Sequence, residues 1–267
     1  MKELAFEIVG NIMVVRNITD IRAVREFAKA KMVKHSYINT VLLQITKVQG
    51  QERKRELKYV MGKNTFKTVH KEYGNSYLVD LSNTFFSPRL SYERQRIAQL
   101  VNRGEIILNL FSGVGPFSIA IAKRQPDCVI HSIEINQVAY QLMLKNIENN
   151  NCKTTVLPYL GDAFEIVQSR FINMVNRILL PLPLESDRSL PLGYNALKNH
   201  QGIIHWQITE HKDSKNISSQ NIEKRVSKIL KNNDIIADFS IEAFRVIRWL
   251  APKIAHIGVD LKFFDGN

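Results

Sequence analysis

The sequence predicts an α/β protein made of a doubly wound sheet and a small α/β domain that precedes it. From residue 105 onward, apolar runs of strand length alternate with stretches of helical periodicity, which is the pattern of βαβ units. One junction between strand and helix carries a glycine loop, as such sheets do where they bind nucleotides. With 267 residues, 45% of them hydrophobic, the chain can fill a core in both parts.

The small domain is expected over residues 1–80. Residues 5–16 favour two short strands around Gly10-Asn11, because this pair tolerates positive φ angles. Asp20 is expected to cap a helix over residues 21–35, whose apolar positions recur at helical spacing. Further strands are expected at residues 39–48, 55–61 and 67–70.

The doubly wound sheet is expected over residues 81–267. Phe86-Ser87-Pro88-Arg89 predicts a rigid, non-helical lead-in, because proline restricts the residue before it. Residues 105–110 are almost continuously apolar, as in a strand that is buried on both faces. Helices are expected at 91–101, 116–123, 137–149, 163–170 and, more weakly, 222–230, and strands at 105–110, 129–135, 155–159, 177–180, 202–208, 244–248 and 255–261.

The charge of the chain points to a polyanionic partner. The formal net charge is +12, and residues 20–75 alone hold thirteen Lys and Arg against five acids, a net +8. Aromatic side chains such as Tyr37, Tyr59 and Phe66 lie between these bases, as in surfaces that bind nucleic acid. A merely solvated charged surface is the plainer alternative, and the aromatics favour nucleic acid over it.

Other classes of protein are excluded by what the sequence lacks. No apolar run approaches the roughly 20 residues of a membrane span, and the N-terminal residues do not resemble a signal peptide. We therefore expect a cytoplasmic protein without a membrane partner. The two cysteines, Cys128 and Cys152, lie far apart in no metal-type spacing, so neither a disulfide framework nor a metal site is expected.

The glycine loop at residues 111–118 predicts a nucleoside-containing cofactor. Gly113 and Gly115 let the backbone approach a ligand, and the following helix offers free N–H groups. Glu134 follows about twenty residues later at the end of the next predicted strand, where a carboxylate accepts hydrogen bonds from ribose hydroxyls.

The details of the loop favour S-adenosylmethionine over NAD. A dinucleotide fingerprint needs Gly or Ala at its third position, and this chain has Ser118 there, with bulky Pro116 and Phe117 inside the loop. Asp162 follows the third strand, where a carboxylate can bind the adenine amino group. As an alternative, Asp162 is a helix N-cap.

Four segments resemble one known family. Residues 68–74 (TVHKEYG), 85–94 (FFSPRLSYER), 109–117 (NLFSGVGPF) and 181–183 (PLP) are similar to the archaeal and eukaryotic tRNA guanine-37 N1-methyltransferases. The likeness extends over roughly residues 5–265 and implies the class I S-adenosylmethionine-dependent, Rossmann-like methyltransferase fold. The family's small N-terminal domain is not matched, so the chain begins at what would be the second domain.

The resemblance implies that a monomer methylates the purine at position 37 in the anticodon loop of tRNA and leaves S-adenosylhomocysteine. It assigns Glu93 as the base that removes a proton, and Arg89 or Lys71 as the cation that stabilises charge developing on O6. Without the family, Glu93 is a first-turn helix carboxylate, and Lys71, Arg89 and Arg94 are phosphate contacts or solvated surface. The resemblance places cofactor contacts at Phe86, Arg94, Phe111, Gly113, Gly115, Glu134, Ile135, Asp162 and Ala163.

Two departures from the family pattern concern specificity. Asn109 replaces a common acid, and Pro181 replaces the Asn of the family's Asn-Leu-Pro motif, so the amide is lost. A pocket formed by Pro181, Leu182 and Pro183 would be more apolar and less specific for guanine.

We therefore expect the branch that resembles the wyosine-pathway enzymes. Its members methylate C7 of 4-demethylwyosine in tRNA-Phe, giving isowyosine, with or without N1 activity on guanosine. The alternatives are N1 methylation only, transfer of an aminocarboxypropyl group, or tRNA binding without catalysis. His205 and Trp206, on a predicted strand, are expected to be core packing.

Overall fold

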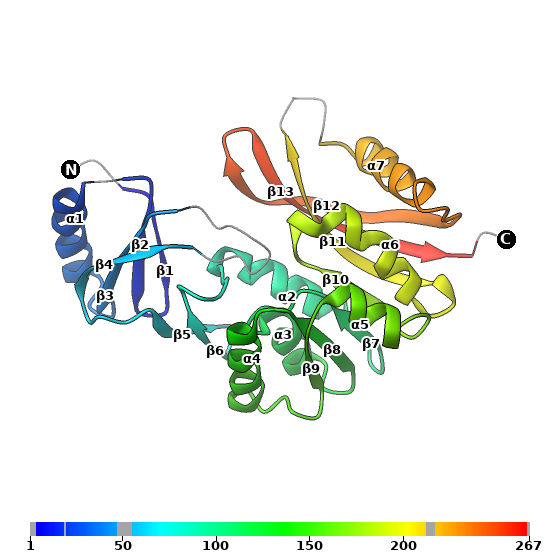
Figure 1. Ribbon diagram of the computed structural model, residues 1–267, viewed down its shortest axis with the longest axis horizontal. Helices are drawn as coiled ribbons and strands as arrows, with labels where there is room; N and C mark the ends of the chain where they lie inside the picture. Colours follow the sequence, from blue (N-terminus) through cyan, green and yellow to red (C-terminus); the bar gives the residue numbers. More distant parts are fainter. Residues whose placement is uncertain (1–3, 19, 47–54, 212–216, 266–267) are drawn as a thin grey trace. The chain divides into compact units, whose positions relative to one another are not determined.

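The computed structural model describes residues 4–18, 20–46, 55–211 and 217–265 (Figure 1). The chain divides into two compact units. The first unit comprises Met1–Ser91, Gly113–Pro116 and Asn136–Asn151, and the second comprises Tyr92–Ser112, Phe117–Ile135 and Cys152–Asn267. No helix within the described ranges has the length and apolar composition needed to cross a bilayer.

The first unit begins with a four-stranded sheet in the order β1-β2-β3-β4. Asp20 caps the helix as predicted, because its Oδ1 accepts hydrogen bonds from the backbone N–H groups of Arg22 and Ala23. The predicted strands are present, although residues 47 and 48 of one of them, and Lys47, Arg53 and Lys54 of the basic segment, lie outside the described residues. The elements are β1 (Phe6–Val9), β2 (Ile12–Val15), α1 (Ile21–Lys34), β3 (Thr40–Gln44) and β4 (Leu57–Gly62).

The first unit also holds the hairpin of β5 (Lys67–Glu72) and β6 (Asn75–Asp80), together with α4 (Gln137–Asn149). β6 was not predicted from the sequence. Both turn residues, Tyr73 and Gly74, have positive φ angles, which a bulky tyrosine does not suggest. Side-chain amides of α4 bind the hairpin backbone: Asn146 accepts from Leu78 N at 2.7 Å and donates to its carbonyl at 3.1 Å.

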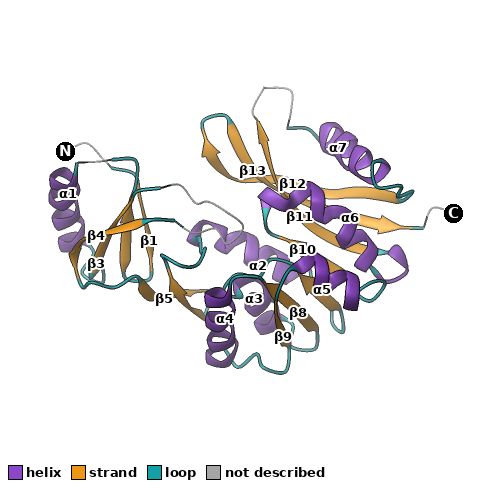
Figure 2. Ribbon diagram, viewed as in Figure 1, coloured by secondary structure: helices purple, strands orange, loops and turns teal. Residues whose placement is uncertain are grey.

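The second unit is built on a seven-stranded sheet in the order β12-β13-β11-β10-β7-β8-β9, drawn in orange in Figure 2. The five strands from β11 to β9 are parallel, and β13 runs antiparallel to both β11 and β12. The strands are β7 (Ile106–Asn109), β8 (Val129–Glu134), β9 (Val156–Leu160), β10 (Arg177–Leu180), β11 (Gly202–His211), β12 (Asp238–Ala251) and β13 (Ile254–Phe264).

The order of the parallel strands reverses between β7 and β10. The chain moves outward from β7 to β8 and β9, and then returns to the other side of β7 with β10. In open α/β sheets, ligands bind outside the carboxyl ends of the strands at such a reversal. The loops after β7 and β10 therefore lie where a ligand is expected.

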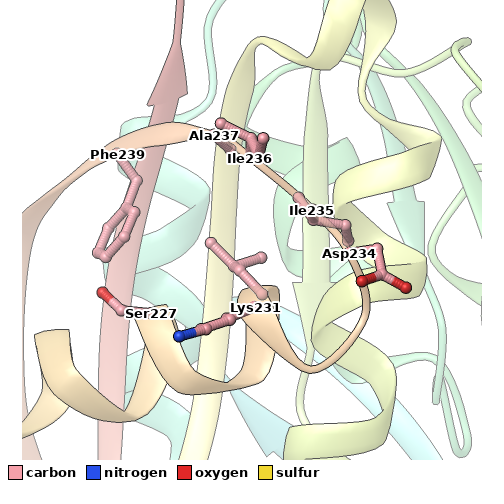
Figure 3. A pocket seen from close by; sticks show the side chains of 8 residues that line it. Ser227, Lys231, Asp234, Ile235, Ile236, Ala237 and Phe239 are labelled. Atoms are coloured by element: carbon pink, nitrogen blue, oxygen red, sulfur yellow. The ribbon is translucent and has the colours of Figure 1, made fainter.

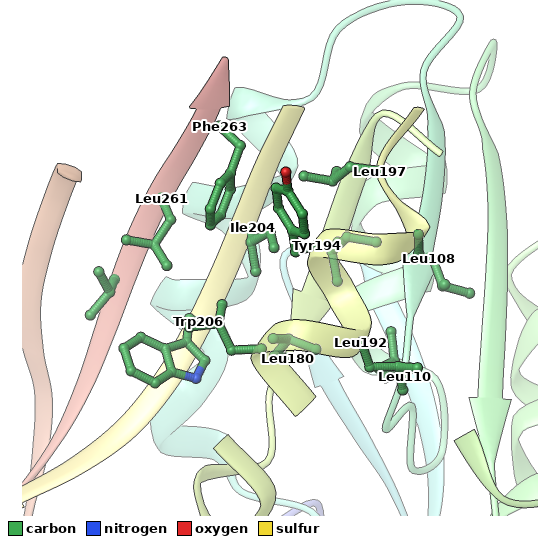
Figure 4. Close-up of a cluster of buried hydrophobic side chains, with 14 of the residues drawn as sticks. Leu108, Leu110, Leu180, Leu192, Tyr194, Leu197, Ile204, Trp206, Leu261 and Phe263 are labelled. Carbon is green, nitrogen blue, oxygen red and sulfur yellow. The ribbon is translucent and has the colours of Figure 1, made fainter. Parts of the chain in front are cut away.

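Helices of the second unit cover the sheet on both faces. On one face, α5, α6 and α7 pack over an apolar cluster of the strands. Figure 4 shows side chains of this cluster, Leu180, Ile204, Trp206 and Leu261 among them. On the other face, side chains of α2 and α3 bind polar groups of the strands. The helices are α2 (Ser91–Leu100), α3 (Pro116–Arg124), α5 (Ala163–Arg170), α6 (Ser186–Ala196) and α7 (Ser219–Lys231).

Two local expectations were wrong. Pro88–Leu90 forms a 3₁₀ turn instead of a non-helical lead-in, because the fixed φ of proline suits the first turn of a helix. Only Ser87, before the proline, is extended. The sequence analysis also missed α6, which contains Pro191 and Gly193. Burial of neighbouring apolar side chains, Leu190 and Leu192 among them, overrides the poor helix propensity there.

Candidate active site

Three predicted cofactor positions meet at the carboxyl edge of the second unit's sheet. Phe111 follows β7, Glu134 ends β8 and Asp162 follows β9. Backbone hydrogen bonds join these strand ends: Ser112 N donates to Ile133 O at 2.9 Å, and Gly161 N donates to Glu134 O at 3.0 Å. Ile135 and Ala163, the adjacent predicted contacts, come to the same edge, so the structure brings this part of the prediction together.

Asp162 fills one of the two roles that the sequence left open. Its Oδ1 accepts a hydrogen bond from Phe164 N at 2.7 Å, so it is the N-cap of α5. Within the described part of the chain, nothing donates to Oδ2. The ring of Phe164 lies 6.5 Å from that of Phe111, and the Arg188 guanidinium lies 3.8 Å over it. One carboxylate oxygen therefore remains for a ligand beside an aromatic pair.

The two unusual residues around the glycine loop are partners. Asn109 Nδ2 donates to Ser118 Oγ at 3.0 Å, and Ser132 Oγ donates to the same oxygen at 2.7 Å. Serine at the third fingerprint position is thus explained by Asn109 at the end of β7. Asn109 Oδ1 is buried and accepts no hydrogen bond from any described residue. Because buried acceptors are normally hydrogen-bonded, this oxygen can accept a hydrogen bond from a ligand.

The residues present fit an adenosine-type cofactor. Carboxylates end or follow two adjacent parallel strands, at Glu134 and Asp162, and can accept from hydroxyl and amino groups. The loop glycines, Gly113 and Gly115, have φ angles of +57° and +86°, a region that residues with a side chain rarely adopt. A side-chain carbon at Gly113 would meet only Phe85 O, at 3.7 Å, so its backbone conformation explains the glycine.

Glu93 lies on α2 and is almost fully buried, with 2% of its surface exposed. Two arginines bind its carboxylate, each through two nitrogens. Arg96 donates at 3.1 Å from Nε and 2.9 Å from Nη2. Arg245, on β12, donates at 2.9 Å from both Nε and Nη2. Glu93 is thus an ion-paired carboxylate, which the sequence did not indicate.

The pairing continues through Asp260 of β13. Arg96 binds Asp260 through Nη1 at 2.6 Å and Nη2 at 2.9 Å, and His205 Nδ1 lies 2.6 Å from Asp260 Oδ1. Burial raises the pKa of Asp260, but the hydrogen bonds from His205 and Arg96 outweigh it and hold that pKa well below its usual value. Burial also lowers the pKa of Arg96, and its bonds to Glu93 and Asp260 more than restore it. Both groups are charged at neutral pH.

His205 links this group to a second ion pair. Burial lowers the pKa of His205 by more than Asp260 raises it, so the ring is neutral near pH 7. A neutral ring donates from Nδ1 to Asp260 and accepts at Nε2 from Arg177 Nη1, at 2.8 Å. Arg177 in turn pairs with Glu105 at 2.6 Å. We call Glu93, Arg96, Arg245, Asp260, His205, Arg177 and Glu105 the α2 cluster.

The expectation of core packing for His205 and Trp206 is confirmed for the tryptophan. Trp206 is fully buried, and its Nε1 donates to Ser186 O at 2.9 Å. His205 is equally buried but points to the other face, into the α2 cluster. Strand alternation separates the two neighbours.

The carboxylate of Glu93 can be related to the predicted substrate loop, residues 181–183, through the pairing of the strands between them. Leu180 pairs with Trp206, so the next residue, Pro181, lies at the level of Gln207. Gln207 pairs with Gly258, and Glu93 Oε1 lies 3.1 Å from the place where a side-chain carbon of Gly258 would be. Pro181 directly follows β10, and Glu93 lies against β13, with β11 between these two strands. Leu182 is buried there and Pro183 is half-buried.

The remaining predicted residues divide between the units. Lys71 and Arg89 are exposed in the first unit, and Phe86 is buried there with its ring 5.1 Å from His70 and 5.8 Å from Tyr77. Arg94, in the second unit, is only 1% exposed, so the alternative of a solvated surface residue is wrong for it.

A hollow beside α7 and the possibility of a metal site were compared with the predicted site residues. A hollow beside α7 and the start of β12 is lined by residues 227–239, including Ile235 and Phe239, and by none of the predicted site residues (Figure 3). Within the described ranges, no three His, Cys, Asp or Glu side chains gather as metal ligands would.

The fold and the strand-end carboxylates define a Rossmann-like methyltransferase of the class that uses S-adenosylmethionine. The TRM5/TYW2 methyltransferase domain matches residues 68–246. The chain belongs to this family, and the predicted fold, tRNA methyltransferase activity and cofactor are confirmed at that level.

Individual relatives agree with this assignment. The chain is 34% identical over 237 residues to the tRNA 4-demethylwyosine(37)-methyltransferase Taw21 of Saccharolobus solfataricus, covering 89% of this chain and 84% of that one. It is 29% identical over 260 residues to the tRNA (guanine(37)-N(1))-methyltransferase Trm5b of Pyrococcus abyssi, covering 97% and 74%. The solved complex of aTrm5 with tRNALeu superposes with a TM-score of 0.81 at 27% identity, covering 97% and 72%.

Proposed function

We propose that this chain methylates C7 of 4-demethylwyosine at position 37 of tRNA-Phe, giving isowyosine, with N1 of guanosine as its second substrate. The observation that carries the choice is Pro181, at the carboxyl edge beside the reversal of strand order. Proline has neither a side-chain donor nor a backbone N–H to offer a guanine edge. Buried Leu182 and half-buried Pro183 suit a larger, flatter and less polar base. The likeness to Taw21 supports this choice, and the likeness to Trm5b supports the second substrate.

S-adenosylmethionine supplies an electrophilic methyl group when it is bound. In this proposal Glu134 accepts from the ribose hydroxyls and Asp162 Oδ2 accepts from the adenine amino group. Phe111, Ile135 and Ala163 line the same edge. The other proposed contacts are Phe86, Arg94, Gly113 and Gly115.

Glu93 is the proposed base. It takes the proton that leaves the target nitrogen or carbon as the methyl group arrives. The position of Glu93 supports this role. Glu93 lies against β13 and Pro181 follows β10, so the target purine would lie between these two residues. Arg89 and Lys71 are the proposed cations for charge that develops on the purine oxygen, and both residues are exposed.

We also propose that residues 1–80 form the tRNA-binding domain, residues 81–267 form the catalytic domain, and a monomer binds the anticodon loop. Exposed bases such as Lys58, Lys63 and Lys67 would contact phosphates. Replacing these three by Gln should lower tRNA affinity and reduce the slope of log K against log salt by about two to three. An unchanged slope would remove these residues from the interface, and sedimentation would check the monomer.

The choice of substrate is tested by incubating the protein with labelled methyl donor and either unmodified tRNA-Phe or tRNA-Phe that carries 4-demethylwyosine. We expect label in the tricyclic base. No label there would overturn the C7 proposal, and label only in guanosine would leave N1 methylation alone. The mass of the product separates a methyl group from an aminocarboxypropyl group. Absence of any transfer, with tRNA bound, would favour a binding protein without catalysis.

A further inference from the structure

Glu93 has no acceptor position left for a proton. Both oxygens of its carboxylate already accept one hydrogen bond from Arg96 and one from Arg245. An ionised carboxylate offers about four lone-pair positions, so four donors fill them. A base in this state can accept a substrate proton only after one guanidinium withdraws.

The two arginines are not held equally. Arg96 is bound on its far side by Asp260, which His205 also holds, and its side chain is 15% exposed. Arg245 is 25% exposed and lies on β12, the outermost strand of the sheet. Among the described residues its guanidinium hydrogen-bonds only to Glu93, and Nη1 donates to none of them. Arg245 is therefore the arginine that can leave with fewer interactions lost.

The net charge around Glu93 favours the departure of Arg245 when Glu93 takes up a proton. Glu93, Arg96, Arg245 and Asp260 carry two negative and two positive charges and are largely buried. A proton on Glu93 would leave one uncompensated positive charge in this place, which is costly away from water. If Arg245 pairs instead with an anionic oxygen of the RNA, the protonated Glu93, Arg96 and Asp260 together are neutral.

We propose that Arg245 is the displaceable counter-ion of Glu93. The RNA substrate draws the guanidinium onto an anionic oxygen, while Arg96, fixed by Asp260, keeps the carboxylate in place. The freed oxygen of Glu93 then accepts the proton of the substrate. At the nitrogen, the electron pair of the broken N–H bond forms the bond to the methyl carbon. At the carbon, a π pair of the ring forms that bond and the pair of the broken C–H bond restores the π system. In both cases the pair of the S–CH₃ bond stays on sulfur. This inference rests on the proposed function, in which Glu93 is the base.

The test is a double-mutant cycle under single-turnover conditions with saturating tRNA and cofactor. We expect Arg245→Gln to slow methyl transfer about tenfold or more, because the counter-ion is lost. A separate steady-state titration with tRNA should give a higher KM, because the RNA contact is lost. In a Glu93→Gln background, Arg245→Gln should slow the reaction by less than about twofold, since residues that act as a unit are not additive. Arg245→Lys should restore most of the rate, because a cation returns.

Controls separate folding from mechanism. Calorimetric affinity for S-adenosylmethionine and the melting temperature should be unchanged in Arg245→Lys. The matched control is Arg103→Gln, which removes an arginine from an exposed ion pair with Asp127 and should leave the rate unchanged. Equal losses from Arg245→Gln in both backgrounds, or no loss at all, would overturn the counter-ion role alone. An unchanged rate in Glu93→Gln would overturn the role of Glu93 as base, and this inference with it.

Discussion

The two faces of the seven-stranded sheet are buried to a similar degree but differ in chemistry. Under α5, α6 and α7 the strands present Leu180, Ile204 and Trp206, which belong to one continuous apolar cluster. The opposite face presents His205 and Asp260 to α2. Alternation along each strand sends neighbouring residues to opposite faces, so one stretch of sequence builds both. Packing of one face supports the fold, and the other face carries the ionised groups.

The polar face tolerates burial because its charges are paired in a continuous series. Each member of the α2 cluster binds the next, from Glu105 through His205 and Asp260 to Arg245. Buried ion pairs add little net stability, because desolvation offsets their attraction, but loss of one partner is costly. This difference between the faces predicts which substitutions affect the rate and which affect the free energy of unfolding.

The largest effect is expected on the polar face, from Glu93→Gln. The amide keeps the shape of the side chain but cannot accept a proton, so methyl transfer should slow by about 10²- to 10⁴-fold. Single-turnover transfer of labelled methyl groups measures this. Calorimetric binding of S-adenosylmethionine should not change, and a rate within about twofold of wild type would contradict the role of base.

On the apolar face, Trp206→Ala should lower the free energy of unfolding by about 3–5 kcal/mol, because it empties a fully buried site. Trp206→Phe should cost less, since mainly the hydrogen bond to Ser186 O is lost. Urea unfolding followed by circular dichroism measures both. Equal losses in the two variants would show that the hydrogen bond, and not the packing, holds this position.

Asp260→Asn tests how much the polar face contributes to stability. It should lower the free energy of unfolding by about 2 kcal/mol at pH 7, because Arg96 loses its buried ion pair with Asp260. Burial raises the pKa of Asp260, but bonds from His205 and Arg96 hold it below 3.8, its unperturbed value. The stabilising contribution is therefore complete above about pH 4 and is lost as the pH falls below that value. Urea unfolding at pH 6, 4 and 3 should show the gap between wild type and variant closing. A constant gap would contradict this.

The smallest effect concerns His205. Burial depresses its pKa below 6.5, so the unfolded chain takes up a proton first as the pH falls. The free energy of unfolding should decrease below about pH 6.5, by at most about 1.4 kcal/mol per pH unit. His205→Gln should lack this part of the pH dependence. If wild type and variant keep parallel profiles between pH 7.5 and 5, the ring is not held neutral.

Local signals in the sequence were sufficient for the parallel strands and the cofactor edge. The apolar run at residues 105–110, the glycine loop and the spacing to Glu134 each depend on contacts close along the chain, and each is found where it was expected. The helix with Pro191 and the hairpin turn at Tyr73 were missed because their local preferences are unfavourable. Burial of apolar side chains outweighs these preferences in α6. Tyr73 is exposed, and the pairing of β5 with β6 forms its turn.

By itself, the sequence determined the fold, the family and the strand-end carboxylates, because these follow from periodicity and from motifs of adjacent residues. Only the tertiary structure decided the environment of Glu93. Its partner Arg245 lies 152 positions further along the chain. Asp260, which holds its other partner Arg96, lies 164 positions beyond that arginine, and the pairing of β12 and β13 brings both strands to α2. Register depends on how whole strands pair, and no local spacing encodes it.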